Sequence, residues 1–171
     1  MINIRREAAH DILAVYEVNK QAFGGTAEAN LVNAVRTREN NLVSLVAVDG
    51  GKVVGHILFS PMKVAGQPEN RTVIGLGPLA VLPDHQKQGV GSKLVRAGLD
   101  ECRREGFKIV AVLGHPEYYP RFGFAPGIRY GVKSEFADAP PEAFMLLELK
   151  PGALGALKGC TLQYMPEFNG V

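Results

Sequence analysis

The spacing of hydrophobic and polar residues along the chain predicts a mixed fold of helices and strands. Apolar and polar residues alternate over residues 1–5, as in a short strand, and recur at helical intervals over residues 8–23. A second amphipathic helix is expected next, with Thr26 in position to cap its first turn. Two strand-like runs then flank an Asp-Gly-Gly turn at residues 49–51, which is typical of a β-hairpin.

The centre of the chain predicts a strand, a turn, a helix and a second strand. Residues 72–82 are strand-like, but two glycines and a proline interrupt them, so we expect a bulge that leaves backbone groups unpaired. Residues 90–102 form an apolar stripe at helical spacing, and residues 107–113 are almost entirely apolar, like a strand buried on both faces. This order predicts a right-handed crossover unit in a mixed sheet.

The last third of the chain has a weaker pattern. We expect one helical turn in residues 116–124, a strand at residues 144–149 and another at residues 160–166. We find no internal repeat, low-complexity run or linker. The expectation is therefore a single domain over residues 1–171, with a core of about residues 2–150 and a C-terminal strand region over residues 151–171.

Composition and charge narrow the classes of function. The 171 residues are 46% hydrophobic with a formal net charge of +2, which predicts no nucleic-acid partner because no basic stripe is present. No apolar run approaches a membrane span and the N-terminus lacks a secretory pattern, so we expect a cytoplasmic protein that does not bind membranes. The two cysteines, Cys102 and Cys160, are too few for a zinc site or a disulfide framework, so we expect reduced thiols and no metal.

The stretch DHQKQGVGSKLV at residues 84–95 carries the clearest chemical signal. A helix that begins here leaves its first backbone N–H groups without internal partners, at the positive end of the helix dipole. Gly89 and Gly91 remove Cβ atoms that would block a bulky anion, and Lys87 and Lys93 add positive charge. The pattern favours a phosphate site, and the alternative is a glycine turn without a ligand. Neither the P-loop nor the dinucleotide-binding motif matches.

Gln86 to Gly91 instead fits the pattern Q/R-x-x-G-x-G/A, directly after a strand that ends in LAVLP. Downstream, YYPRFGF at residues 118–124 fits an aromatic-Tyr-x-x-x-Gly-Phe segment. With the order of the elements, these motifs make roughly residues 2–150 resemble the GNAT superfamily of acyl-CoA-dependent N-acetyltransferases. The resemblance implies an α/β (α+β) fold: a mixed, mostly antiparallel sheet with a splayed central strand pair and flanking helices.

The resemblance also implies which residues bind acetyl-CoA. The coenzyme A pyrophosphate would lie on the turn, and the pantetheine arm would follow the free edge of the interrupted strand. The residues implied are Gln86, Lys87, Gln88, Gly89, Val90, Gly91 and Ser92 for the turn, and Leu79, Ala80 and Val81 for the strand.

The implied reaction moves an acetyl group from acetyl-CoA to an amine by direct attack. Tyr119 aligns with the tyrosine that often protonates the leaving thiolate in this superfamily. Its neighbour Tyr118 is the alternative acid, although such a neighbour more often faces the core. The strand VIGLGPLAV has no carboxylate, which favours a water chain or a more distant residue as the general base, with Glu28, His115 and Glu117 as candidates. We expect His56 and His85 to be structural or solvated.

Two other classes of function are consistent with parts of the sequence. A non-catalytic acyl-CoA-binding or sensor module would keep the same turn. A plain structural or interaction domain is disfavoured, because it would not need two glycines at the start of a helix. The acceptor is an amine on either a small molecule or a protein. The sequence leaves open whether the chain is a monomer or a homodimer.

Overall fold

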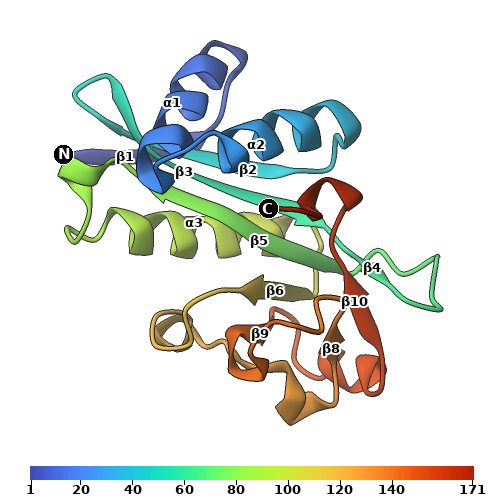
Figure 1. The fold of residues 1–171 in the computed structure, drawn as a ribbon. Helices are drawn as coiled ribbons and strands as arrows, with labels where there is room; N and C mark the ends of the chain where they lie inside the picture. The colour runs from blue at the N-terminus through green and yellow to red at the C-terminus, as the bar shows by residue number, and fades with distance from the viewer.

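The computed structural model describes residues 1–171, and its central element is a seven-stranded sheet in the order β1-β2-β3-β5-β6-β9-β7 (Figure 1). Every neighbouring pair is antiparallel except β5 and β6, which run parallel. This confirms the predicted mixed, mostly antiparallel sheet and the crossover at its centre. The strands of the large sheet are β1 (Ile2–Arg6), β2 (Val43–Asp49), β3 (Lys52–Pro61), β5 (Val73–Val81), β6 (Ile109–Leu113), β7 (Ala125–Pro126) and β9 (Phe144–Glu148).

Three α-helices cover the two faces of the sheet: α1 (Ile12–Phe23) and α2 (Ala27–Arg38) on one face, and α3 (Val90–Arg104) on the other (Figure 1). All three were predicted. The first begins later than expected, because Ala9–Asp11 form a separate 3-10 turn before it. The second begins directly after Thr26, but the threonine side chain makes no capping hydrogen bond, so the expected cap is wrong. None of the helices is long and apolar enough to cross a membrane.

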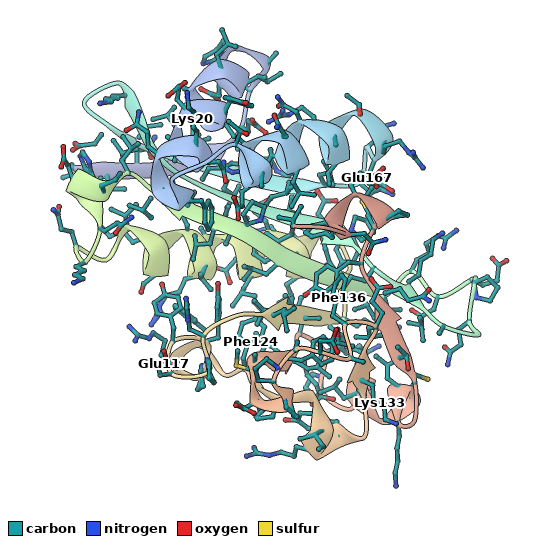
Figure 2. All side chains as sticks on the ribbon, in the orientation of Figure 1. Lys20, Glu117, Phe124, Lys133, Phe136 and Glu167 are labelled. Atoms are coloured by element: carbon teal, nitrogen blue, oxygen red, sulfur yellow. The ribbon has the colours of Figure 1, made fainter.

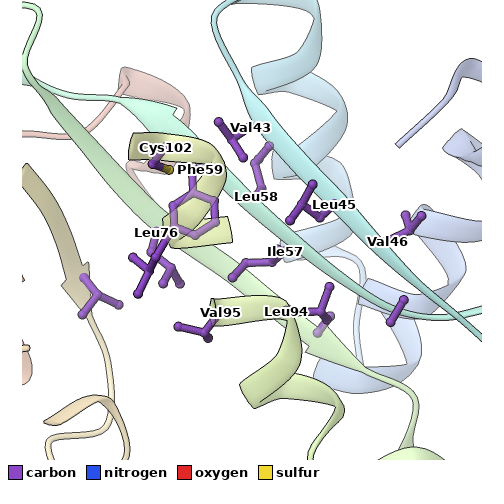
Figure 3. Close-up of a cluster of buried hydrophobic side chains, with 14 of the residues drawn as sticks. Val43, Leu45, Val46, Ile57, Leu58, Phe59, Leu76, Leu94, Val95 and Cys102 are labelled. Atoms are coloured by element: carbon purple, nitrogen blue, oxygen red, sulfur yellow. The ribbon is translucent and has the colours of Figure 1, made fainter. Parts of the chain in front are cut away.

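The main hydrophobic core covers both faces of the sheet, with α3 packed on one face and α1 and α2 on the other, and Figure 3 shows a part of it. Leu94 and Cys102 of α3 are completely buried against strands β2, β3 and β5. Gly98 lies where the ring of Phe59 approaches the helix, and no larger side chain would fit there. The amphipathic pattern of residues 90–102 is therefore explained by packing against one face of the sheet.

Strand β5 changes partners half-way along its length. Residues Val73–Leu76 pair with Ile109–Val112 of β6, but the remainder of β5 pairs only with β3. The register with β3 shifts there: one β3 residue, Leu58, lies opposite both Gly77 and Pro78. This bulge confirms the predicted interruption, and beyond it β5 and β6 separate.

The last third is more irregular than the sequence predicts. The two expected strands exist as β9 and a shorter β10 (Thr161–Gln163), but residues 151–171 consist mostly of turns. β10 pairs with β4 (Lys63–Val64) and β8 (Lys133–Ser134) in a second sheet that was not expected. Strands of two or three residues are too short to show a periodic pattern. The 3-10 turns of the chain are η1 (Ala9–Asp11), η2 (Pro83–His85), η3 (Tyr119–Phe122), η4 (Gly127–Tyr130), η5 (Pro141–Ala143), η6 (Ala153–Leu157) and η7 (Pro166–Phe168).

Candidate active site

A cavity of about 1140 Å³ lies where β5 and β6 separate. Its walls come from parts of the chain that are far apart in sequence: the bulged part of β5, the turn before α3, the end of β6 with η3, the junction of α1 and α2, and the C-terminal segment. Most of the residues singled out from the sequence lie on this cavity. They are Leu79, Val81, Gln86, Lys87, Gly89, Gly91, Ser92 and Tyr119.

The turn before α3 presents a row of unpaired backbone donors. None of the six backbone amides from Lys87 to Ser92 donates a hydrogen bond within the protein, and the first bond of the helix runs from Lys93 N to Gly89 O (3.1 Å). Gly89 occupies the N-cap position with φ of 85°, and Lys87 also has a positive φ of 61°. Unpaired amides at the start of a helix, with lysine beside them, are suited to bind an anion.

The two glycines of the turn have different roles. A Cβ at Gly89 would meet no atom within 4 Å, so glycine is needed there for the left-handed backbone rather than for space. At Gly91, a Cβ would lie 3.1 Å from the hydroxyl of Tyr118, so this glycine keeps the first turn of the helix accessible.

Two glutamine side chains hold the turn in place. Gln86 Nε2 donates to Val81 O (2.9 Å), and Gln88 Nε2 donates to Asp84 O (3.0 Å). Gln88 does not line the cavity, and neither does Val90, whose side chain is buried in the core. These two residues therefore contribute to the turn only through their unpaired backbone amides.

The bulged part of β5 exposes alternate backbone groups to the gap. Leu82 N donates to Val54 O of β3 (2.8 Å). Because the backbone N–H and C=O groups of successive strand residues point to opposite edges, those of Val81 and Leu79 point away from β3, toward β6. Ala80 is in register with His56 of β3 and is buried. The structure therefore brings Leu79 and Val81 to the cavity but not Ala80.

Tyr119 lies at the far end of β6. Its ring packs over Gly114, where a Cβ would be 2.6 Å from the ring atom Cε2, and the side chain is 7% exposed. Its hydroxyl makes no hydrogen bond within the protein, and the residue lines the cavity. Burial raises the pKa of Tyr119, so the phenol remains protonated at neutral pH.

Tyr118 was expected to face the core, but its hydroxyl points to the first turn of α3. It lies 3.5 Å from Ser92 Oγ, and the guanidinium of Arg121 stacks on its ring at 4.4 Å. Both Tyr118 and Arg121 line the cavity at its α3 end. Nothing in the sequence distinguishes the two adjacent tyrosines in this respect, because their directions depend on how η3 packs.

The candidate bases differ in position. Glu28, in the first turn of α2, and His115, just after β6, line the cavity. Glu117 does not line it and extends outward from the loop after β6 (Figure 2).

The remaining titratable residues of interest are structural. His56 is completely buried between Ser44 (2.9 Å) and Asn19 (3.1 Å), and burial lowers its pKa to about 3. Cys102 is buried in the core, where burial raises the pKa of its thiol, and Cys160 is half-buried. Neither cysteine lines the cavity.

Comparison with known proteins agrees with this geometry. Residues 3–127 match the acetyltransferase (GNAT) domain family. The chain belongs to this family. It is 33% identical over 167 residues to the uncharacterized N-acetyltransferase YhbS of Escherichia coli, and this match covers 97% of the chain and 98% of YhbS. It is 42% identical over 118 residues to the uncharacterized N-acetyltransferase YjhQ of Escherichia coli, but this match covers 68% of the chain and only 65% of YjhQ.

Two solved GNAT structures are similar over nearly the whole chain. The structure of YhbS from Escherichia coli in complex with CoA superimposes with a TM-score of 0.92 at 32% identity, covering 98% of this chain and 92% of that one. The structure of a GNAT family acetyltransferase from Brucella melitensis in complex with acetyl-CoA gives a TM-score of 0.81 at 31% identity, covering 99% of both chains. Family membership confirms the predicted fold and the predicted class, an acetyl-CoA-dependent acyltransferase.

Proposed function

We propose that this chain is an N-acetyltransferase that binds acetyl-CoA between β5 and β6 and transfers the acetyl group directly to an amine. The observation that carries the proposal is that one cavity joins three features. These are the turn with six unpaired amides, the free edge of β5 and the hydroxyl of Tyr119.

The donors around the cavity fit the chemistry of coenzyme A. The amides from Lys87 to Ser92, the start of α3 and the Lys87 ammonium would hold the pyrophosphate. The free N–H and C=O of Leu79 and the N–H of Val81 would pair with the amides of the pantetheine arm, as a neighbouring strand would, whereas the C=O of Val81 already accepts from Gln86 Nε2. When bound, acetyl-CoA supplies an acetyl thioester, whose carbonyl carbon is the electrophile.

Tyr119 acts as the general acid in this proposal. A new bond from the acceptor nitrogen to the acetyl carbon replaces the carbon–sulfur bond, and Tyr119 donates its phenolic proton to the departing sulfur. A backbone amide of Leu79 or Val81 donates to the carbonyl oxygen while negative charge develops on it. Glu28 or His115 takes the proton that the amine loses. The products are an acetamide and a free thiol, and no cysteine takes part.

One experiment tests both the transfer and its direct character. The purified chain is mixed with acetyl-CoA and a set of amines, and free thiol and acetylated product are measured for the parent and for a Cys102→Ala, Cys160→Ala variant. We expect equal turnover, because the buried Cys102 is poorly ionised and neither thiol reaches the cavity.

Two results would contradict the proposal. An acetylated cysteine, trapped during turnover and required for it, would replace direct transfer by a two-step reaction. Tight binding of acetyl-CoA with no thiol release for any amine would instead indicate the non-catalytic acyl-CoA-binding module.

A further inference from the structure

The cavity has an end that the binding of acetyl-CoA does not use. It lies on the face of the sheet covered by α1 and α2, opposite α3, where the C-terminal segment runs beside α2 (Figure 1). Its side chains are mostly aromatic or aliphatic. They are Phe23, Leu31, Phe136, Phe168 and Val171, with Tyr164 and Glu28 as the polar members. We call this group the acceptor end.

Charge is divided between the two ends. Lys87 and Arg121 lie at the α3 end, where an anion is expected, whereas Glu28 is the only carboxylate that lines the cavity. The Glu28 carboxylate makes no ion pair and accepts no hydrogen bond within the protein. A half-buried carboxylate without a partner, surrounded by apolar side chains, favours a ligand with one positive charge.

Tyr164 provides an independent sign of a ligand at the acceptor end. Its side chain is 6% exposed, and its buried hydroxyl makes no hydrogen bond of normal geometry within the protein, although the backbone amide of Leu113 lies nearby and acts to lower the pKa of this tyrosine. The ring lies over Gly75 of β5, where a Cβ would be 2.9 Å from Cε1. The ring can pack here because Gly75 has no side chain. A buried hydroxyl without a partner costs free energy, and a polar group of a ligand would offset that cost.

The position of Tyr164 relates it to the reaction. Its hydroxyl lies near the backbone amide of Leu113, the last residue of β6, and close enough to Tyr119 that this neighbour adds to the effect of burial in raising the pKa of Tyr164. Tyr164 packs over Gly75, which pairs with Ala111 of β6, whereas Tyr119 packs over Gly114, three residues further on and therefore on the opposite face. The two tyrosines therefore meet at the split between β5 and β6 from opposite faces.

We propose that the acceptor end binds a primary amine that carries a single aromatic or bulky apolar group. Glu28 attracts the ammonium form of this amine, and the hydroxyl of Tyr164 accepts a hydrogen bond from its nitrogen at the split. Phe23, Phe136 and Phe168 pack against the apolar group and contribute cation–π attraction. Polyamines and amino sugars are poor acceptors, because their additional charges find no further carboxylate side chain on the cavity wall; Glu135, near Tyr164, does not line the cavity and accepts from Tyr164 N (3.0 Å). This inference rests on the proposed acetyl transfer.

The test compares three acceptors at saturating acetyl-CoA: 2-phenylethylamine, ethylamine and spermidine. We expect kcat/KM for 2-phenylethylamine to exceed that for ethylamine by about 10-fold or more, because the ring is removed from water. Phe168→Ala should reduce this ratio several-fold. Glu28→Gln should lower kcat/KM for 2-phenylethylamine and leave the Kd of acetyl-CoA unchanged. Glu69→Gln, in an exposed loop far from the cavity, is the matched control and should change neither.

Tyr164→Phe separates a role in binding from a role in folding. The variant removes a hydroxyl that makes no hydrogen bond of normal geometry and has only the Leu113 amide nearby, so its melting temperature should change little. Its KM for 2-phenylethylamine should nevertheless rise several-fold.

The outcomes distinguish this inference from the proposed function. Equal or better turnover of spermidine or ethylamine would overturn the aromatic acceptor and leave acetyl transfer intact. An unchanged KM in a stable Tyr164→Phe variant would remove Tyr164 from the acceptor site. Absence of acetylation for every amine, with acetyl-CoA still bound, would overturn both.

Discussion

The two ends of the cavity are constructed in different ways. The α3 end is formed mainly by one continuous stretch, Gln86–Ser92, which presents backbone amides, with Tyr118 and Arg121 beside it. The acceptor end is assembled from side chains on α1, α2, the loop at Phe136 and the C-terminal segment. Backbone recognition suits a ligand that the whole family shares, because it depends on the shape of the turn. Recognition by side chains can change with single substitutions, so acceptors can differ while the cosubstrate stays the same.

The largest effect is expected at Tyr119, where the two ends meet. Tyr119→Phe should lower the single-turnover rate by about 10²–10⁴-fold, because the departing sulfur loses its proton donor. The Kd of acetyl-CoA should change little, since the hydroxyl acts mainly in the transition state. Stopped-flow detection of free thiol measures the rate, and calorimetric titration measures the Kd.

Tyr118→Phe is the matched control for this substitution. Because the Tyr118 hydroxyl faces Ser92 on the α3 end, its loss should weaken acetyl-CoA binding slightly and leave the chemical rate nearly unchanged. A Tyr119→Phe variant as fast as the parent would exclude Tyr119 as the acid.

Gly91→Val should break the α3 end without affecting the acceptor end. The new side chain would meet the Tyr118 hydroxyl and cover the unpaired amides, so acetyl-CoA affinity should fall about 10- to 100-fold. The order of preference among amines should stay the same. Gly155→Ala, at an exposed glycine with open space around it, is the control for the loss of a glycine. Unchanged affinity in a folded Gly91→Val protein would contradict anion binding at this turn.

The smallest expected effect is a dependence of the free energy of unfolding on pH, which arises from a difference between the two faces of the sheet. The α3 face is apolar, whereas the opposite face buries His56 with Asn19 and Ser44. His56 has a pKa of about 3 in the folded protein instead of 6.5. Between these values the unfolded chain binds a proton that the folded protein does not, so the free energy of unfolding falls as the pH falls. The slope approaches about 1.4 kcal/mol per pH unit.

Urea unfolding between pH 7.5 and pH 4.5 measures this slope. His56→Gln should flatten it, and His85→Gln, at a half-exposed histidine beside Asp49, should leave it unchanged. Asp11, whose pKa is lowered to about 2 mainly by its hydrogen bond to Arg5, contributes in the same direction only below its ordinary value of 3.8. The same slope in the parent and in His56→Gln would show that another group causes the acid sensitivity.

Sequence patterns predicted the α3 end well because its determinants are local. A strand, a glycine at the N-cap and an amphipathic helix follow one another directly, so the free amides of the turn can be read from neighbouring residues. The pattern did not resolve finer points, such as the alternation that turns Ala80 away from the cavity and the space that Gly91 leaves for Tyr118.

The order of the elements, the bulged strand and the glycine turn before α3 could be predicted from the sequence, since each depends on residues within a few positions of one another. The acceptor end, in contrast, depends on tertiary packing. Tyr164 reaches the split because Gly75 admits its ring and because two- and three-residue strands hold the C-terminal segment in place. Glu28 lies on the same cavity because α2 packs beside that segment. Such contacts join residues that lie far apart in the sequence, and their geometry depends on the packing of the whole chain.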